Sequence, residues 1–176
     1  FRFCSGSWLE DQDFWRMPGL FRSVTLYALP RTHFADIDAQ AVLNDTFTAG
    51  ALRVKVKLQG ELHGKVTLEM EGRRVQAFID SDTVGIALNV ENPLLWSAEE
   101  PHLYAYTLQV LDEYDNVVEQ VSLRAGFRRF ELQNGLMMLN GKRIVFKGVN
   151  RHEWDCRTGR TVTREDMKAD ILAMKH

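Results

Sequence analysis

Between Ala51 and Gln59 the sequence reads ALRVKVKLQ. Leu and Val at positions 52, 54, 56 and 58 alternate with Arg and Lys at positions 53, 55 and 57. A period of two residues is typical of a β-strand that turns one face toward a core and the other toward water. We therefore predict a sheet here with one buried face.

Similar short runs lie on both sides of this strand. Glu71-Gly72 and Asp115-Asn116 are turn-forming pairs, and Asn92-Pro93 ends a run. The runs cover residues 34–42, 66–70, 73–78, 86–90, 104–110 and 117–123. About seven short strands without helical periodicity between them predict an antiparallel, immunoglobulin-like β-sandwich over residues 31–126, although the Cys and Trp spacing of antibody domains is absent.

A different pattern follows Gly126. Asn134-Gly135 and Asn140-Gly141 are strong turn signals, and Arg143–Phe146 has the consecutive apolar residues of a strand covered on both faces. Thr163-Arg-Glu-Asp166 fits a capping box that starts a helix. We predict one βα unit after the sandwich.

The beginning of the chain holds two further strand ends, at Phe1–Cys4 and Ser23–Ala28, separated by an acidic and aromatic loop. The sequence starts without Met or a secretory signal, and it stops inside a helical pattern. We expect it to be a piece cut from a longer protein.

Composition excludes several classes of function. Lys and Arg number 22 against 24 Asp and Glu, a net charge of −2, so we expect neither nucleic acid nor an anionic membrane surface as a partner. No apolar run approaches the roughly 18 residues of a membrane span. Cys4 and Cys156 form no C-x-x-C metal or redox motif.

Four longer motifs occur in a fixed order. They are WLEDQDFWRMPGLFR at 8–22, NVENPLLWS at 89–97, PHLY at 101–104 and GVNRHE at 148–153. With them the chain resembles glycoside hydrolase family 2, and within it the large bacterial β-galactosidases. The resemblance implies an all-β fragment with three parts: the end of a jelly-roll sugar-binding domain at 1–30, an immunoglobulin-like domain at 31–126, and the start of a TIM barrel at 127–176.

The family resemblance also implies a reaction. Family members of this kind hydrolyse terminal β-D-galactose residues with retention, using two glutamates that lie on barrel strands beyond this sequence. We therefore expect the sandwich to be a spacer and the fragment to be inactive alone. For the parent enzyme the resemblance implies a β-galactoside substrate, contacts with its remaining domains, bound sodium and magnesium, a homo-oligomeric state and a cytoplasmic location.

Two residues are candidates for binding substrate. Asp13 lies in Glu10-Asp-Gln-Asp13, a cluster that is more often simply solvated, but the resemblance implies that Asp13 reaches the sugar O6 and a sodium ion. His152 follows the predicted first barrel strand at the end where barrel enzymes place functional residues. The resemblance implies that His152 hydrogen-bonds galactose hydroxyls.

The neighbours of His152 have weaker claims. We expect Glu153 to form a structural salt bridge or hydrogen bond, and Asn150 and Arg151 to shape the same loop. Trp154 departs from the His that often follows His-Glu in similar sequences, which puts any contact from that position in doubt.

The other tryptophans have competing explanations. Trp faces suit pyranose rings, but packing is the more common role, and we expect it for Trp8 and Trp15. Trp96, beside Pro93 and Pro101, is predicted to anchor the edge of the sandwich.

Two alternatives remain open. The chain could be a free-standing carbohydrate-binding sandwich that uses Asp13 and aromatic residues as a lectin site. Alternatively, its parent could be a β-glucuronidase or β-mannosidase of the same family.

Overall fold

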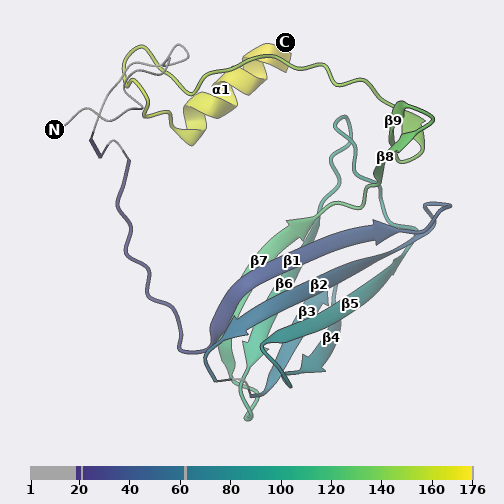
Figure 1. Cartoon of the computed structure of the whole chain (residues 1–176), viewed down its shortest axis with the longest axis vertical. Coiled ribbons are helices and arrows are strands. Elements are labelled where there is room, and N and C mark those ends of the chain that lie inside the picture. The colour runs from purple at the N-terminus through teal and green to yellow at the C-terminus, as the bar shows by residue number, and fades with distance from the viewer. Residues whose placement is uncertain (1–18, 21, 62, 176) are drawn as a thin grey trace. The chain divides into compact units, whose positions relative to one another are not determined.

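The computed structural model describes residues 19–20, 22–61 and 63–175, and it divides the chain into two compact units. One unit combines Phe1–Tyr27 with Lys147–His176, and the other is the continuous segment Ala28–Phe146. The named strands all lie in the second unit, and the helix lies in the first (Figure 1). In the described part of the chain, no helix has the length and apolar character needed to cross a bilayer.

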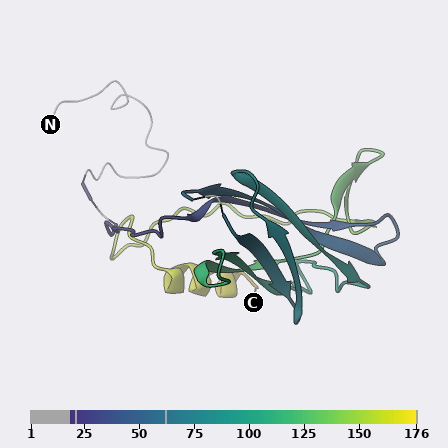
Figure 2. The same cartoon turned by 90° about the horizontal axis from the view of Figure 1, so that it is seen from below.

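The Ala28–Phe146 unit contains a sandwich of two antiparallel sheets (Figures 1 and 2). The first has the order β1-β2-β5, formed by β1 (His33–Leu43), β2 (Ala49–Gln59) and β5 (Thr83–Glu91). The second has the order β4-β3-β6-β7, formed by β3 (Lys65–Met70), β4 (Arg73–Phe78), β6 (Tyr104–Leu111) and β7 (Val117–Ala125). The predicted β-sandwich and its seven strands are confirmed.

The core lies between the two sheets. Along β2, alternate side chains from Leu52 to Leu58 are buried while the Arg and Lys side chains between them are exposed. The facing sheet contributes Leu68 and Leu108, which are fully buried. Because successive side chains of a strand point to opposite faces, the buried apolar side chains of the two sheets meet in one layer between them.

Short turns join the strands. Glu71 and Gly72 between β3 and β4 have φ angles of 52° and 72°, the left-handed backbone of a two-residue hairpin turn. Between β6 and β7, the Asp112 carboxylate accepts hydrogen bonds from the Tyr114 and Asn116 amides at 2.9 and 2.8 Å. Hydrogen bonds from Asn116, first from its side chain, hold the pKa of Asp112 below its usual value. Both turns stand where the sequence predicts them.

A small third sheet follows the sandwich. It has the order β10-β9-β8, with β8 (Phe130–Gln133), β9 (Leu136–Leu139) and β10 (Lys142–Arg143). The predicted strand over Arg143–Phe146, covered on both faces, is wrong, because β10 ends at Arg143 and Val145 and Phe146 are 65% and 67% exposed. Beyond β10, the Ile144 amide donates one hydrogen bond to the Met137 carbonyl at 2.9 Å. A barrel strand needs partners on both edges, and the described residues supply none beyond β9.

The unit formed by the two ends of the chain contains helix α1 (Arg164–Lys175). The predicted capping box is confirmed: the Thr163 hydroxyl accepts from the Asp166 amide at 3.2 Å, and the Thr163 amide donates to the Asp166 carboxylate at 3.0 Å. The strand end expected at Ser23–Ala28 is wrong, since this segment has no strand structure and Val24 and Leu26 are exposed. No partner strand for it exists among the described residues. Phe1–Cys4 lies outside them.

Candidate functional site

The segment Gly148–Glu153 has no regular structure, and His152 is exposed on it. The His152 carbonyl accepts a hydrogen bond from the Trp154 amide at 2.9 Å, which closes a tight bend around Glu153. The candidate histidine therefore lies on an accessible loop of the α1-containing unit, and Trp154 beside it is half-buried.

Ion pairs anchor the residues on both sides of His152. The Arg151 guanidinium donates from Nε and Nη2 to one oxygen of Asp170, at 2.9 and 2.5 Å, which ties the loop to α1. Arg22 Nη2 donates to Glu153 Oε2 at 3.0 Å, so the structural salt bridge predicted for Glu153 is confirmed. With its carboxylate engaged in this pair, Glu153 serves as a structural contact of the loop.

A turn at residues 155–159 follows the His152 loop. The Asp155 and Gly159 backbones exchange hydrogen bonds at 2.9 and 2.8 Å, and Asp155 Oδ1 accepts from the amides of Arg157 and Thr158. A hydrogen bond from the Arg157 side chain, followed by the Arg157 and Thr158 amides, lowers the pKa of Asp155 to about 2. Asp155 is thus an ionised, turn-forming carboxylate at neutral pH, and Cys156 beside it is exposed.

The other predicted substrate and metal ligand, Asp13, lies outside the described residues, as do Trp8, Trp15 and Cys4. Within residues 19–20, 22–61 and 63–175, no three or more His, Cys, Asp or Glu side chains come together to hold a metal ion. The assignments of Asp13 and His152 to a sugar site therefore both stay predictions.

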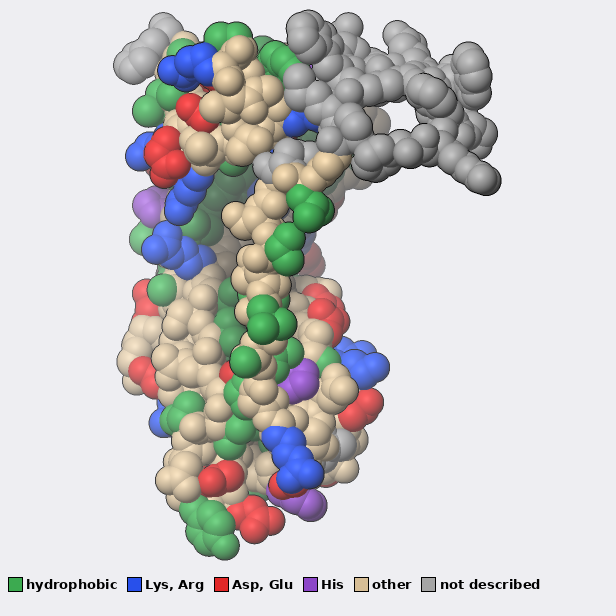
Figure 3. Space-filling model, turned by 90° about the vertical axis from the view of Figure 1, so that its left-hand side faces the viewer, with side chains coloured by type: hydrophobic (Ala, Val, Ile, Leu, Met, Phe, Trp, Pro, Cys, Tyr) green, Lys and Arg blue, Asp and Glu red, His purple; other side chains and the backbone are tan. Residues whose placement is uncertain are grey.

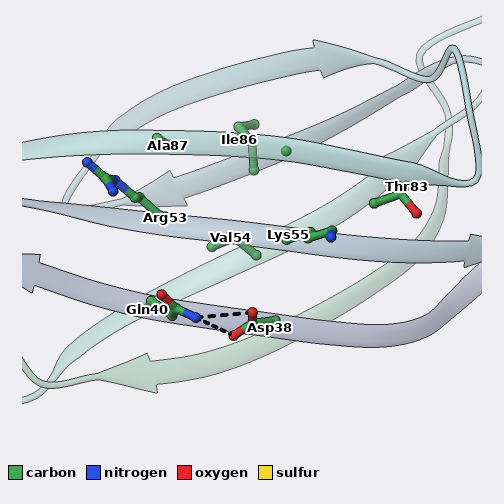
Figure 4. Close-up of a pocket in the computed structure, with 9 residues that line it drawn as sticks. Asp38, Gln40, Arg53, Val54, Lys55, Thr83, Ile86 and Ala87 are labelled. Carbon is green, nitrogen blue, oxygen red and sulfur yellow. Dashed lines mark hydrogen bonds between the residues drawn. The ribbon is translucent and has the colours of Figure 1, made fainter.

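A hollow of about 500 Å³ lies on the outer face of the β1-β2-β5 sheet (Figure 4). Arg53 and Lys55 of β2 lie on its wall, and on β1 Gln40 donates to the Asp38 carboxylate at 3.2 and 3.3 Å. Asp38 is the one carboxylate among its lining residues. Glycoside hydrolysis by the usual routes requires two carboxyl groups, so this hollow lacks the necessary pair.

Charged side chains are spread over the surface. On the part of the face drawn in colour in Figure 3, blue Lys and Arg and red Asp and Glu are interspersed with hydrophobic groups. The coloured part of that face therefore has no continuous positively charged patch of the kind that binds phosphate backbones.

Trp96 has the anchoring role that its position predicted. Its backbone amide donates to the Phe127 carbonyl at 2.9 Å, and the Arg128 guanidinium lies 4.5 Å from the centre of its ring. Phe127, Arg128, Arg129 and Asn140 pack around this point; the sequence indicates Asn140 only as a turn residue and gives no signal for the other three. Their partners are distant in sequence, so no local spacing could have indicated them.

Two family profiles match the chain. The profile for glycosyl hydrolases family 2 matches residues 30–128, and the profile for the TIM barrel domain of that family matches residues 130–176. The chain is 45% identical over 179 residues to a β-galactosidase of Halalkalibacterium halodurans, covering 97% of this chain and 18% of that protein. It is 46% identical over 182 residues to a β-galactosidase of Streptococcus thermophilus, covering 99% of this chain and again 18% of the relative.

Solved structures share the fold. The apo structure of Bacteroides uniformis β-glucuronidase 3 matches with a TM-score of 0.77 and 25% identity, covering 93% of this chain and 21% of that one. A β-glucuronidase of Parabacteroides merdae matches with a TM-score of 0.71 and 26% identity, covering 84% and 20%. The chain thus spans less than a quarter of the length of these proteins.

Proposed function

The chain belongs to glycosyl hydrolase family 2, and we propose that the protein it forms part of is a retaining β-galactosidase acting on terminal non-reducing β-D-galactose. The observation that carries this proposal is the identity of 45% and 46% to two bacterial β-galactosidases over nearly the whole chain. The structural matches to β-glucuronidases have lower identities, 25% and 26%, and support the shared fold more than a shared substrate.

Within that enzyme the sandwich is a structural spacer. Its buried side chains form a continuous core between two sheets, and the hollow on its β1-β2-β5 face has one carboxylate, Asp38, among its lining residues. Retaining hydrolysis requires one carboxyl group as nucleophile and another as acid and base, about 5 to 5.5 Å apart. We assign both groups to parts of the parent protein other than this chain.

The proposed contribution of this chain to the sugar site is His152, with Asp13 as its second half. A neutral imidazole can donate or accept a hydrogen bond with a sugar hydroxyl, and the exposed loop position of His152 leaves it accessible. The carboxylate of Asp13 suits a hard cation such as sodium, which would supply fixed positive charge beside a sugar oxygen. For magnesium the described residues offer no ligand cluster, so that proposal extends to the parent alone.

Two wider properties of the parent belong to the same proposal. We propose a homo-oligomeric enzyme in the cytoplasm that acts on β-galactosides and assembles its site from this chain and its remaining domains. The family membership supports the assembly from several domains, because the chain matches both a sandwich and a barrel profile.

The test is the activity of the parent polypeptide on nitrophenyl glycosides. The expected result is a clear preference for the β-galactoside over the β-glucuronide and the β-mannoside. A preference for the glucuronide would replace the proposal with the activity of the structural matches. The lectin alternative is tested by calorimetry on the 176-residue chain: millimolar or tighter galactoside binding that Asp13→Ala abolishes would favour a binding module.

A further inference from the structure

Two turns in the third sheet have the same sequence and the same backbone but different surroundings. Asn134 and Gly135, between β8 and β9, have φ angles of 51° and 77°; Asn140 and Gly141, between β9 and β10, have 51° and 74°. Both are two-residue hairpin turns in which Asn and Gly meet the demand for a left-handed backbone. Asn134 is exposed, whereas Asn140 is half-buried against the sandwich.

The Asn140 side chain joins three segments of the chain. Its Oδ1 accepts from the Arg129 amide at 2.9 Å, and its Nδ2 donates to the Trp96 carbonyl at 3.0 Å. Its own amide donates to the Arg129 carbonyl at 2.8 Å. The bond to Trp96 crosses 44 residues of sequence, so it fastens the third sheet to the loop that connects β5 and β6. Nothing in hairpin geometry requires this bond.

Two arginine side chains add further contacts at the same place. Arg128 stacks over Trp96, and the Arg129 guanidinium lies 4.5 Å from the centre of the Phe47 ring, in the turn between β1 and β2. Arg129 Nη1 also donates to Asp45 of that turn at 2.9 Å. The contacts reach both the β1–β2 turn and the β5–β6 loop, which restrains the third sheet on two sides.

Close packing leaves little room for rearrangement. A Cβ added to Gly141 would lie 3.1 Å from the Phe47 ring, so the second turn touches the sandwich directly. Phe127, at the start of the connection, is fully buried and packs edge-on against Tyr104 at a ring distance of 5.2 Å. Interiors packed in this way resist small displacements.

We propose that residues 127–143 are a rigid extension of the sandwich, fastened by the Asn140 side chain and by the Arg128–Trp96 and Arg129–Phe47 stacks. The family profiles divide the chain between residues 128 and 130. These contacts instead make the third sheet part of the sandwich, whose compact unit ends at Phe146. The sandwich therefore fixes the direction in which the chain leaves it. The relevance of this to catalysis rests on the proposed function, but the rigidity itself does not.

The matched turns supply the experiment. Asn140→Gly and Asn134→Gly make the same change in the same backbone conformation, because glycine accepts a positive φ without strain. Only the first removes the side-chain bonds to Arg129 and Trp96. Amide hydrogen exchange is measured by NMR on the 176-residue chain and both variants, with the buried β6 residue Leu108 as an internal reference for the sandwich.

The expected result is protection of the β8 and β9 amides in the unmodified chain and a common alignment of the third sheet and the sandwich in residual dipolar couplings. Asn140→Gly should accelerate exchange in β8 and β9 roughly tenfold or more relative to Asn134→Gly, with Leu108 unchanged. Equal effects of the two variants, or unprotected β8 and β9 amides in the unmodified chain, would overturn the proposal.

A second variant guards against failure of Asn140→Gly to fold. Arg128→Lys keeps the charge but loses the planar stack on Trp96, so it should accelerate exchange in the third sheet without altering the Leu108 amide. Exchange identical to that of the unmodified chain would contradict the proposal. These measurements need no glycosidase assay, so their failure and the failure of the proposed function can be told apart.

Discussion

His152 is the residue on which the proposed sugar contact depends. It is exposed, and the ion pairs of Arg151 with Asp170 and of Glu153 with Arg22 hold its loop on both sides. In the parent enzyme, His152→Ala should lower kcat/KM for a β-galactoside by roughly 10- to 100-fold, as expected for the loss of one or two hydrogen bonds to the transition state. Steady-state kinetics measure this change.

The control for that variant is His63→Ala, which removes an exposed histidine from the sandwich. It should leave kcat/KM near that of the unmodified enzyme. Equal kinetics for the two variants would remove His152 from the sugar site while leaving the family assignment intact.

Asp155 offers a test of the turn that follows this loop. Its pKa is lowered to about 2, first by the hydrogen bond from the Arg157 side chain. A carboxyl group with a depressed pKa in the folded state favours folding above its unfolded pKa of about 3.9, and this contribution is lost as the pH falls through about 2. An NMR titration of the Asp155 carboxyl carbon should therefore show a midpoint near 2.

Arg157→Gln is the variant that tests the cause. It removes the charged partner but keeps the backbone amides that donate to Asp155, so the midpoint should rise toward the ordinary value without reaching it. A midpoint that does not move would show that the backbone bonds alone set the pKa.

Among the elements, the strands of the sandwich are those that the sequence predicts best. The alternation in β2 suffices because burial on one face imposes a two-residue period whatever the neighbours are. The strand predicted over Arg143–Phe146 is wrong because its apolar pattern depends on neighbouring strands. Consecutive apolar residues indicate a strand covered on both faces only if partners are present, and β10 stops at Arg143.

Asn140 shows a second limit of sequence analysis. Its turn is indistinguishable in sequence from Asn134-Gly135, and both were predicted from the same local signal. The difference lies in a bond to Trp96 across 44 residues, which only the folded chain reveals. For the candidate site, the motif GVNRHE and its place after the predicted strand both indicate His152, and Asp13 lies outside the described residues.

Helix α1 begins with a reciprocal cap that can be removed by one substitution. Thr163→Ala deletes the hydroxyl that accepts from the Asp166 amide and donates to its carboxylate at 2.7 Å. Loss of such a cap should destabilise the helix by about 1 kcal/mol. The α1 amides should then exchange roughly fivefold faster in an NMR measurement, because opening becomes less costly.

A neighbouring substitution serves as the control for the cap. Glu165→Gln changes a first-turn charge without touching the bonds between Thr163 and Asp166, so its effect on α1 exchange should be smaller. Faster exchange in Glu165→Gln than in Thr163→Ala would indicate that charge at the helix start, and not the cap, limits opening.

At the scale of the whole molecule, the described core belongs to the sandwich unit. Helix α1 has no buried residue, and Ile171 and Met174 on it are about half exposed, at 53% and 49%. A helix stabilised mainly by tertiary packing gains little from such a surface. Among the described residues, the buried hydrophobic core thus lies in the sandwich unit, and the His152 loop and α1 contribute no buried side chain.

The pKa values of the carboxyl groups bear on whether this chain can catalyse hydrolysis by itself. A retaining glycosidase needs an acid whose pKa is raised so that it stays protonated near neutral pH. Among the described carboxyl groups with a resolved shift, Asp112, Asp155 and Asp166 all have lowered pKa values, each through hydrogen bonds in a turn or helix cap. These groups are ionised at neutral pH and cannot donate a proton to a leaving group.

We therefore expect the purified 176-residue chain to release no nitrophenol from nitrophenyl β-galactoside above the rate of buffer alone. Glu153, the glutamate nearest His152 in sequence, forms an ion pair with Arg22. If turnover appears, Glu153 is the first residue to test as its catalytic carboxyl group. The decisive measurement compares the chain with Glu153→Gln after identical purification. Turnover that persists equally in both samples would indicate a contaminating enzyme, whereas turnover abolished by Glu153→Gln would place a catalytic carboxyl group in this chain and overturn the proposed spacer role.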